Sequence, residues 1–174
     1  MSPERGETPS DMRKMKVDKL GIDLLTHDPV VILVDDDKRY LPILIGPFEA
    51  TAIALALEGT PVPRPLSHDL MKSIIESLKA HVVRILIHDI HDNTYYAKIV
   101  LEAGSATIEI DARPSDSIAL ALRTNSPIYV SERIVLEESA VDRTTQEQDM
   151  KKFKKYIDNL KPSDFLKGKG DDKK

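Results

Sequence analysis

The chain has 174 residues, a net charge of −4, 41% hydrophobic and 31% charged residues, and no cysteine. This composition predicts one soluble globular domain, and the lack of cysteine excludes disulfides, thiolate-bound zinc and a cysteine nucleophile. No apolar run is long enough to cross a bilayer, and residues 1–14 contain no apolar stretch typical of a signal peptide. We therefore predict a cytoplasmic protein with no membrane partner.

Charge is unevenly distributed along the chain. Residues 151–174 contain nine lysines and four aspartates, a net charge of +5, which leaves −9 on the first 150 residues. Such an acidic body lacks the basic face that a constitutive duplex-DNA-binding protein presents. The basic tail is either a phosphate-attracting arm or, as is commoner, solvated charge at a chain end.

The first half predicts three strands and a helix. The expected strands cover residues 17–25, 30–34 and 40–45, and the expected helix covers residues 47–58. Val30 to Val34 is an unbroken β-branched and aliphatic run, which is typical of a buried strand. Pro47 suits the first position of a helix, and Gly59 is expected to end it.

A proline-rich connector and a second helix follow. We expect this helix at residues 68–79, with an apolar face of Leu70, Ile74, Ile75 and Leu78. The second half then predicts strands at residues 81–88, 95–102, 107–111 and 128–130, with Ile108 and Ile110 pointing inward, and a helix at residues 114–123 between the last two. A final helix is expected at about residues 146–160, anchored by Phe153, Tyr156, Ile157 and Leu160.

The chain contains an internal repeat at an offset of 65 residues. The pentapeptide Ile-Ala-Leu-Ala-Leu occurs at residues 53–57 and again at residues 118–122, and a matching strand precedes each copy. Duplication explains this better than a chance similarity of two Ala/Leu-rich helices. We expect the two helices to be buried near a pseudo-two-fold axis, among the sheets of both halves.

These elements predict an α+β fold in which a three-strand-plus-helix unit is duplicated. Mixed or antiparallel sheets pack around the two buried helices, with an extra helix between the repeats and a C-terminal helix. The expected organisation is a disordered segment at residues 1–14, a domain at residues 15–143, a C-terminal helix at residues 144–166 and a disordered basic tail at residues 167–174. Within the domain, we place repeat one at about residues 16–60, the connector and helix at 61–80, and repeat two at about 81–130.

Four parts of the chain carry recognisable motifs: Asp111 to Arg123 with Pro127 to Val130, Gly46 to Leu57, His68 to Met71 and Phe153 to Phe165. These motifs resemble the bifunctional nuclease family, formerly a domain of unknown function. The resemblance covers about residues 15–166. It implies a duplicated α+β domain that is commonly a homo-oligomer, with nuclease activity on DNA and RNA.

The corner between the last long strand and the following helix carries the best candidates for chemistry. Phosphodiester cleavage generally needs carboxylates that hold divalent cations and a cation that stabilises phosphate charge. We propose Asp111, Asp116 and Glu49 as catalytic residues and ligands of Mg²⁺ or Mn²⁺, with Arg113 stabilising the phosphate. No organic cofactor is expected. Possible secondary residues are His68, Asp69, Ser115 and Arg123.

The same residues also have structural interpretations. Ser115 or Asp116 can cap a helix, Arg113 can tie a strand to a helix, and Arg123 can complement the C-terminal end of a helix dipole. His68 and Asp69 fit the start of a helix as well. The run from His88 to Asp92 invites a metal interpretation but is better explained as a solvated hairpin end.

Two functions remain open at this stage. The first is a metal-dependent nuclease that acts on DNA, RNA or both. The alternative is a non-catalytic oligomeric module that recognises an anionic ligand or a protein partner. The acidic body and the absence of a known metal-ligand motif favour the alternative, whereas the family resemblance favours the nuclease.

Overall fold

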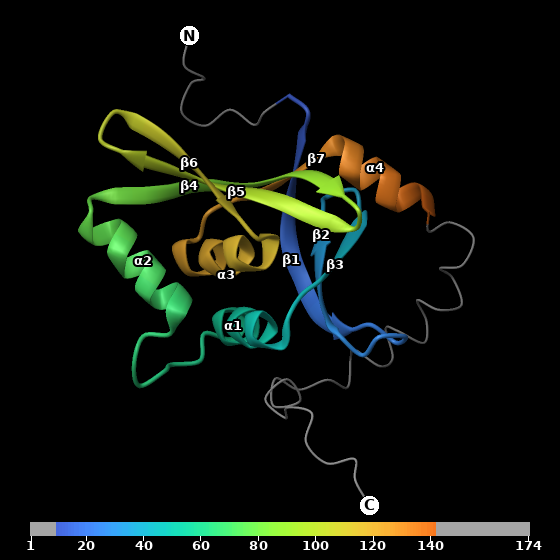
Figure 1. Cartoon of the computed structure of the whole chain (residues 1–174), viewed down its shortest axis with the longest axis horizontal. Coiled ribbons are helices and arrows are strands. Elements are labelled where there is room, and N and C mark those ends of the chain that lie inside the picture. The colour runs from blue at the N-terminus through green and yellow to red at the C-terminus, as the bar shows by residue number, and fades with distance from the viewer. Residues whose placement is uncertain (1–9, 142–174) are drawn as a thin grey trace, which may run out of the picture.

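The computed structural model describes residues 10–141, and their side chains through residue 138. Within the described residues, seven strands and four helices follow one another along the chain (Figure 1). The elements are β1 (Met12–Ile22), β2 (Pro29–Val34), β3 (Tyr40–Leu44), α1 (Pro47–Glu58), α2 (Ser67–Ser77), β4 (Ala80–His91), β5 (Thr94–Ala103), β6 (Ala106–Ala112), α3 (Pro114–Thr124), β7 (Ile128–Ser131) and α4 (Glu132–Val141).

The strands form one mixed sheet in the order β3-β2-β1-β7-β4-β5-β6. Each half is an antiparallel meander of three strands, and β7 lies between the two meanders. Strand β7 pairs in parallel with β4 and antiparallel with β1, whose first four residues pair with β7 and whose remainder pairs with β2. The α+β fold class is therefore confirmed, whereas the duplication itself stays a prediction.

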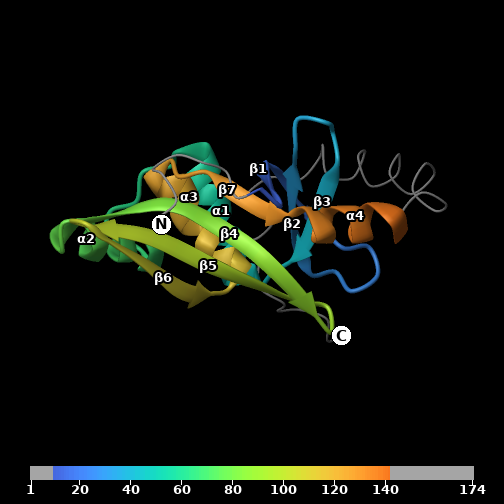
Figure 2. The ribbon, with the colours of Figure 1, turned by 90° about the horizontal axis from the view of Figure 1, so that it is seen from above.

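Helix α3 packs on one face of the second meander, and α1 packs against α3 and β2, as Figures 1 and 2 show. Both helices begin with proline, where the missing N–H costs no helical hydrogen bond. Gly59 ends α1 and Asn125 ends α3, each in the left-handed conformation. The two helices therefore start and stop by the same local rules.

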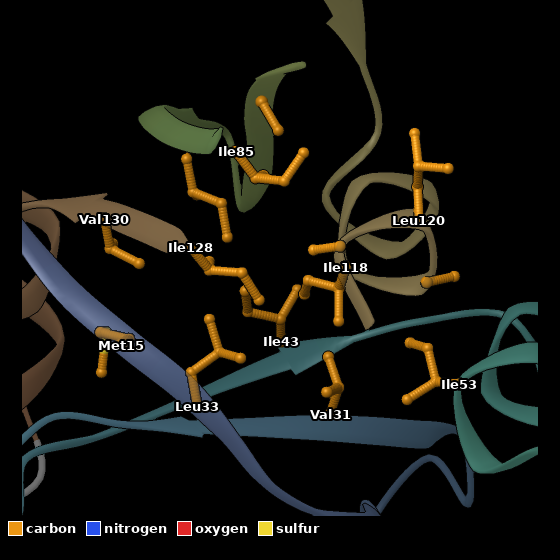
Figure 3. Packing of buried hydrophobic residues seen from close by; sticks show 14 of the residues in the cluster. Met15, Val31, Leu33, Ile43, Ile53, Ile85, Ile118, Leu120, Ile128 and Val130 are labelled. Carbon is orange, nitrogen blue, oxygen red and sulfur yellow. The ribbon is translucent and has the colours of Figure 1, made fainter. Parts of the chain in front are cut away.

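A single hydrophobic core joins the two halves (Figure 3). Ile53 of α1 and Ile118 of α3 are fully buried, in the same cluster as Leu33 of β2, Ile85 of β4 and Val130 of β7. Full burial of such a side chain contributes about 1.5–3 kcal/mol. Since the cluster spans both meanders, neither half has a complete core of its own.

The first residues of α1 and α3 are two positions further apart than the 65-residue offset of the repeated pentapeptide. The pentapeptides place Ile53 opposite Ile118, but Pro47 and Pro114 are the first residues of the two helices and are 67 positions apart. In that register Ile53 corresponds to Leu120, and both side chains are buried. Ile118 is fully buried as well, so both registers pair buried side chains, and only the helix starts separate them.

The expectation that Ile108 and Ile110 point inward is wrong. Ile108 and Ile110 are each 43% exposed, because β6 is an edge strand and no described element covers its end of the sheet. The apolar face of α2 is also largely open, with Leu70, Ile74 and Leu78 exposed. Alternating apolar residues therefore identified the strand and the helix but not what packs against them.

Some element boundaries also differ from expectation. Strand β1 begins at Met12, inside the segment expected to be disordered. Helix α4 was not expected, because its sequence is acidic and only Ile134 and Val135 among its described side chains are buried. The predicted C-terminal helix at residues 144–166 and the tail at 167–174 lie outside the described residues. Within residues 10–141, no helix has the length and apolar content to span a bilayer.

Candidate functional site

Four of the predicted site residues form a connected polar chain. The guanidinium of Arg113 donates from Nη1 to Oε1 of Glu49 at 2.8 Å and from Nε to Oδ2 of Asp116 at 2.7 Å. The other oxygen of Asp116 lies 3.0 Å from Nε2 of His68. We call Glu49, His68, Arg113 and Asp116 the Arg113 cluster.

The packing of three helices creates this cluster. Glu49 lies in the first turn of α1, Asp116 in the first turn of α3 and His68 in the first turn of α2. Helix α3 contacts both α1 and α2, which brings the three helix starts to one place. A first-turn carboxylate also complements the positive end of a helix dipole. Secondary structure and ion pairing therefore favour the same arrangement.

Gly46 makes room for the carboxylate of Glu49. A Cβ atom at this position would clash with Oε2 of Glu49, although the backbone φ of Gly46 is an ordinary −76°. Glycine therefore leaves space here for the carboxylate of Glu49 in its observed position, and its backbone freedom is not used.

The charges of the cluster are mutually stabilised. Burial acts to raise the pKa of Asp116, but hydrogen bonds from Arg113 and His68 outweigh it, so the pKa of this carboxyl lies below its ordinary value. The hydrogen bond that Arg113 donates to Asp116 in turn raises the pKa of Arg113. His68 is only 6% exposed, whereas the side chain of Arg113 is 66% exposed. Arg113 is therefore the cation that the cluster presents to solvent.

Asp69 and Arg123 form a separate pair. Nε of Arg123 donates to Oδ1 of Asp69 at 2.6 Å, and the other oxygen of Asp69 accepts the backbone N–H of Leu66 at 2.9 Å. Arg123 also donates to the carbonyl of Ala119 at 2.9 Å near the end of α3. These contacts tie the start of α2 to the end of α3, and Arg123 is largely buried. The pair holds two helices together.

Asp111 and Ser115 do not join the Arg113 cluster. Asp111 lies on β6, is exposed, and its carboxylate has no partner among the described side chains. Ser115 is buried beside Arg113 at the start of α3. Nowhere in residues 10–138 do three or more His, Asp or Glu side chains gather in a way that could hold a metal ion. The predicted ligand set of Asp111, Asp116 and Glu49 is thus not assembled.

A cleft of about 580 Å³ lies beside Arg113. Its walls come from the start of α3, the end of β3, the β1–β2 turn, the β4–β5 hairpin and α4. Tyr95 and Glu138 are part of this lining; burial and the neighbouring Glu138 raise the pKa of Tyr95, which therefore stays a neutral phenol. Neither residue was predicted from sequence, since nothing in the local pattern marks them.

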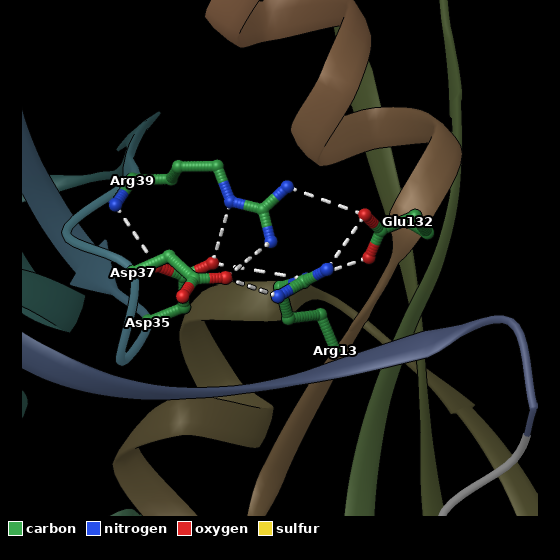
Figure 4. A network of polar contacts seen from close by, with 5 residues as sticks. All are labelled: Arg13, Asp35, Asp37, Arg39 and Glu132. Carbon is green, nitrogen blue, oxygen red and sulfur yellow. Dashed lines mark hydrogen bonds and ion pairs between the residues drawn. The ribbon is translucent and has the colours of Figure 1, made fainter.

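A second polar network lies at the N-terminal end of β1 (Figure 4). Arg13 donates to Glu132 at 2.6 Å and to Asp37 at 2.7 Å, and Arg39 donates to Asp35 at 2.8 Å and to Glu132 at 3.2 Å. The hydrogen bond from Arg13 lowers the pKa of Glu132 to about 2, although partial burial opposes it. Arg13 and Arg39 thus link Asp35 and Asp37, between β2 and β3, to Glu132 at the start of α4.

Comparison with known proteins identifies the family. Residues 30–143 match the model of the bifunctional nuclease domain, so the chain belongs to this family. It is 37% identical over 164 residues to an uncharacterized protein of Mycobacterium tuberculosis, a match that covers 88% of this chain and 98% of that protein.

The plant relatives are more distant. Bifunctional nuclease 1 of Oryza sativa subsp. japonica is 29% identical over 116 residues, and bifunctional nuclease 1 of Arabidopsis thaliana is 23% identical over 120 residues. These matches cover 64% and 67% of this chain but only 35% and 37% of the plant proteins. The chain thus corresponds to about a third of each plant protein.

Proposed function

We propose that this chain is a nuclease that hydrolyses phosphodiester bonds of DNA, RNA or both, with Arg113 binding the phosphate. The observation that carries the proposal is an exposed guanidinium held by two carboxylates at the start of a helix, in a member of the bifunctional nuclease family. A helix start and an arginine are both suited to binding phosphate.

Two carboxylates fix the orientation of the Arg113 guanidinium, which keeps further N–H donors for a ligand. Glu49 and Asp116 engage Nη1 and Nε, whereas Nη2 has no partner among the described residues. A guanidinium fixed in this way binds a phosphate without first losing much conformational freedom. Its charge would stabilise the pentavalent state as the oxygen of water bonds to phosphorus and the ester P–O bond breaks.

Asp111 is the carboxylate available for a further role. It lies two residues before Arg113, is exposed, and is not engaged by any described cation. It is our candidate for accepting the proton of the attacking water or for binding a divalent cation. Glu49 and Asp116 are already bound to Arg113, so their proposed catalytic role is to position it.

The requirement for Mg²⁺ or Mn²⁺ stays a prediction. A cation bound jointly by Glu49 and Asp116 would have to displace Arg113, and the described residues offer no preformed site of three ligands. Assays with each metal and with a chelator address the requirement directly.

The decisive experiment compares Arg113→Ala with Arg133→Ala. Arg133 is a matched control because it is 52% exposed and pairs with the carboxylates of Asp89 and Glu137. Purified proteins are tested on single-stranded and duplex DNA and RNA, with Mg²⁺, Mn²⁺ or chelator. We expect Arg113→Ala to lower the cleavage rate by about 100-fold or more, and the control to retain it.

Asp116→Asn provides a second arm. It keeps the size of the side chain but removes the charge that holds Arg113, so we expect a loss of about 10- to 100-fold. Full activity in both Arg113→Ala and Asp116→Asn would point to a contaminating nuclease. The non-catalytic binding module would then be the better account of the Arg113 cluster.

The homo-oligomer and the cytoplasmic location also stay predictions. The exposed apolar side chains of α2, together with Ile108 and Ile110 on β6, form apolar surfaces that an assembly would cover. Light scattering coupled to gel filtration measures the assembly size.

A further inference from the structure

The cleft beside Arg113 has an uneven chemical character. Pro42 and the 58% exposed Leu44 of β3 give it an apolar wall, with Ile90 from the end of β4. Arg113 contributes a cation to the same lining, whereas Asp23 and Asp28 contribute carboxylates from the β1–β2 turn. The cleft therefore combines an apolar surface, one cation and an acidic region.

This combination restricts what can bind. A volume of about 580 Å³ is within the range of pockets that hold small organic ligands, about 300–1,000 Å³. The pKa of Asp23 is lowered, first by the backbone N–H of Thr26, so this carboxylate stays ionised and repels anions. Phosphate is therefore favoured only at Arg113, and the rest of the cleft suits a flat, uncharged group with N–H donors. A nucleobase has these properties, because its faces are apolar and its edges carry amino groups.

We propose that this cleft is a nucleoside-binding subsite, which takes one unpaired base while Arg113 holds the adjoining phosphate. The inference rests on the proposed nuclease function and adds a substrate class to it, namely single-stranded nucleic acid. A base inside a duplex is stacked and paired, so it enters such a cleft only after it leaves the helix, at a cost of a few kcal/mol. Single strands carry no comparable cost.

Binding of small probes tests the subsite without any cleavage. Adenosine 5′-monophosphate, adenosine and ribose 5-phosphate are titrated separately and followed by NMR chemical shifts. We expect adenosine 5′-monophosphate to bind at least about tenfold more tightly than ribose 5-phosphate, with shifts at residues that line the cleft. Equal affinity for the two, or shifts confined to other surfaces, would overturn the subsite.

Variants separate the base contact from the phosphate contact. Thr94→Trp places a large side chain in the cleft from the exposed start of β5 and should abolish adenosine binding while ribose 5-phosphate still binds. Arg113→Ala should weaken ribose 5-phosphate and leave adenosine unchanged. Leu44→Ala should weaken adenosine severalfold, and the matched control Leu78→Ala, an exposed leucine at the end of α2, should not. Unchanged adenosine binding in Thr94→Trp would refute the proposal.

Cleavage assays distinguish this inference from the proposed function. We expect a single-stranded oligonucleotide to be cut at least about tenfold faster than the same sequence in a duplex, and Thr94→Trp to lose this preference. Arg113-dependent cleavage at equal rates on both substrates would refute the nucleoside-binding subsite and would still support the proposed nuclease function. Binding of adenosine 5′-monophosphate without any Arg113-dependent cleavage would instead refute the proposed nuclease function and leave the subsite supported.

Discussion

Glu49 and Asp116 occupy the same position in two different helices and bind the same guanidinium. Each is the third residue of its helix, after Pro47 and Pro114 as first residues, and each lies within 2.8 Å of Arg113. The shared position means that each helix dipole stabilises one carboxylate, and the two carboxylates together bind one guanidinium. Neither carboxylate alone would hold the orientation of so exposed an arginine.

Gly46→Ala tests whether this orientation matters. The added methyl group would push the flexible end of Glu49 away from Arg113, so we expect a loss of stability of at most about 1 kcal/mol, since exposed ion pairs contribute little. The cleavage rate should fall more clearly, because Arg113 loses one of its two anchors. Chemical denaturation and initial rates measure the two effects.

A double variant provides the control for this prediction. If the clash acts through Glu49, adding Glu49→Ala to Gly46→Ala should change neither stability nor rate further. Additive effects of the two substitutions would contradict the steric explanation.

We expect His68→Ala to destabilise the fold, and the proposed function gives His68 no contact with a substrate. His68 is 94% buried and bonded to Asp116, so its removal leaves a small cavity and a carboxylate oxygen without its partner. We expect a loss of about 1–3 kcal/mol in the free energy of unfolding. His81→Ala removes a histidine that is paired with Glu102 but 67% exposed, and should cost less than about 0.5 kcal/mol. Comparable losses in the two variants would show that the bond to Asp116 is unimportant.

Acid should weaken the contact between α4 and the sheet. The pKa of Glu132 is lowered from 4.5 to about 2, so the folded state binds fewer protons than the unfolded state between these values. The contribution of Glu132 to the free energy of unfolding is therefore fully present above about pH 4.5, and it is lost as the pH falls toward 2. Glu132→Gln should flatten this part of a plot of unfolding free energy against pH. An unchanged slope in that variant would assign the acid sensitivity to other carboxylates.

Burial predicts a large difference between Ile118 on α3 and Ile110 on β6. Ile118→Ala removes a fully buried side chain and should cost about 2–5 kcal/mol, whereas Ile110→Ala on the edge strand should cost well under 1 kcal/mol. Thermal unfolding of both variants gives the comparison. A large loss in Ile110→Ala would mean that β6 is covered in solution, as an assembly through this edge would require.

The local elements of this protein are determined by short-range rules that the sequence displays. Pro47 and Gly59 set the limits of α1 because one lacks an N–H and the other adopts the left-handed conformation. The run Val30 to Val34 predicts a strand buried on both faces, and all five residues are buried. The α+β class and the pairing of Arg113 with Asp116, three residues apart, follow from equally local information.

Other features depend on how the elements pack, and the sequence alone does not contain them. Ile108 and Ile110 alternate like core residues, but the order of the strands puts β6 at an edge, where no described element covers them. Likewise, only the contact of α1 and α2 with α3 brings Glu49 and His68 to the same corner. Tyr95 and Glu138 line the same cleft as Arg113 only because of the sheet order and the packing of α4 on the sheet. Periodicity reports which side of an element is apolar, whereas tertiary structure decides what lies against that side, because that depends on residues far away in the chain.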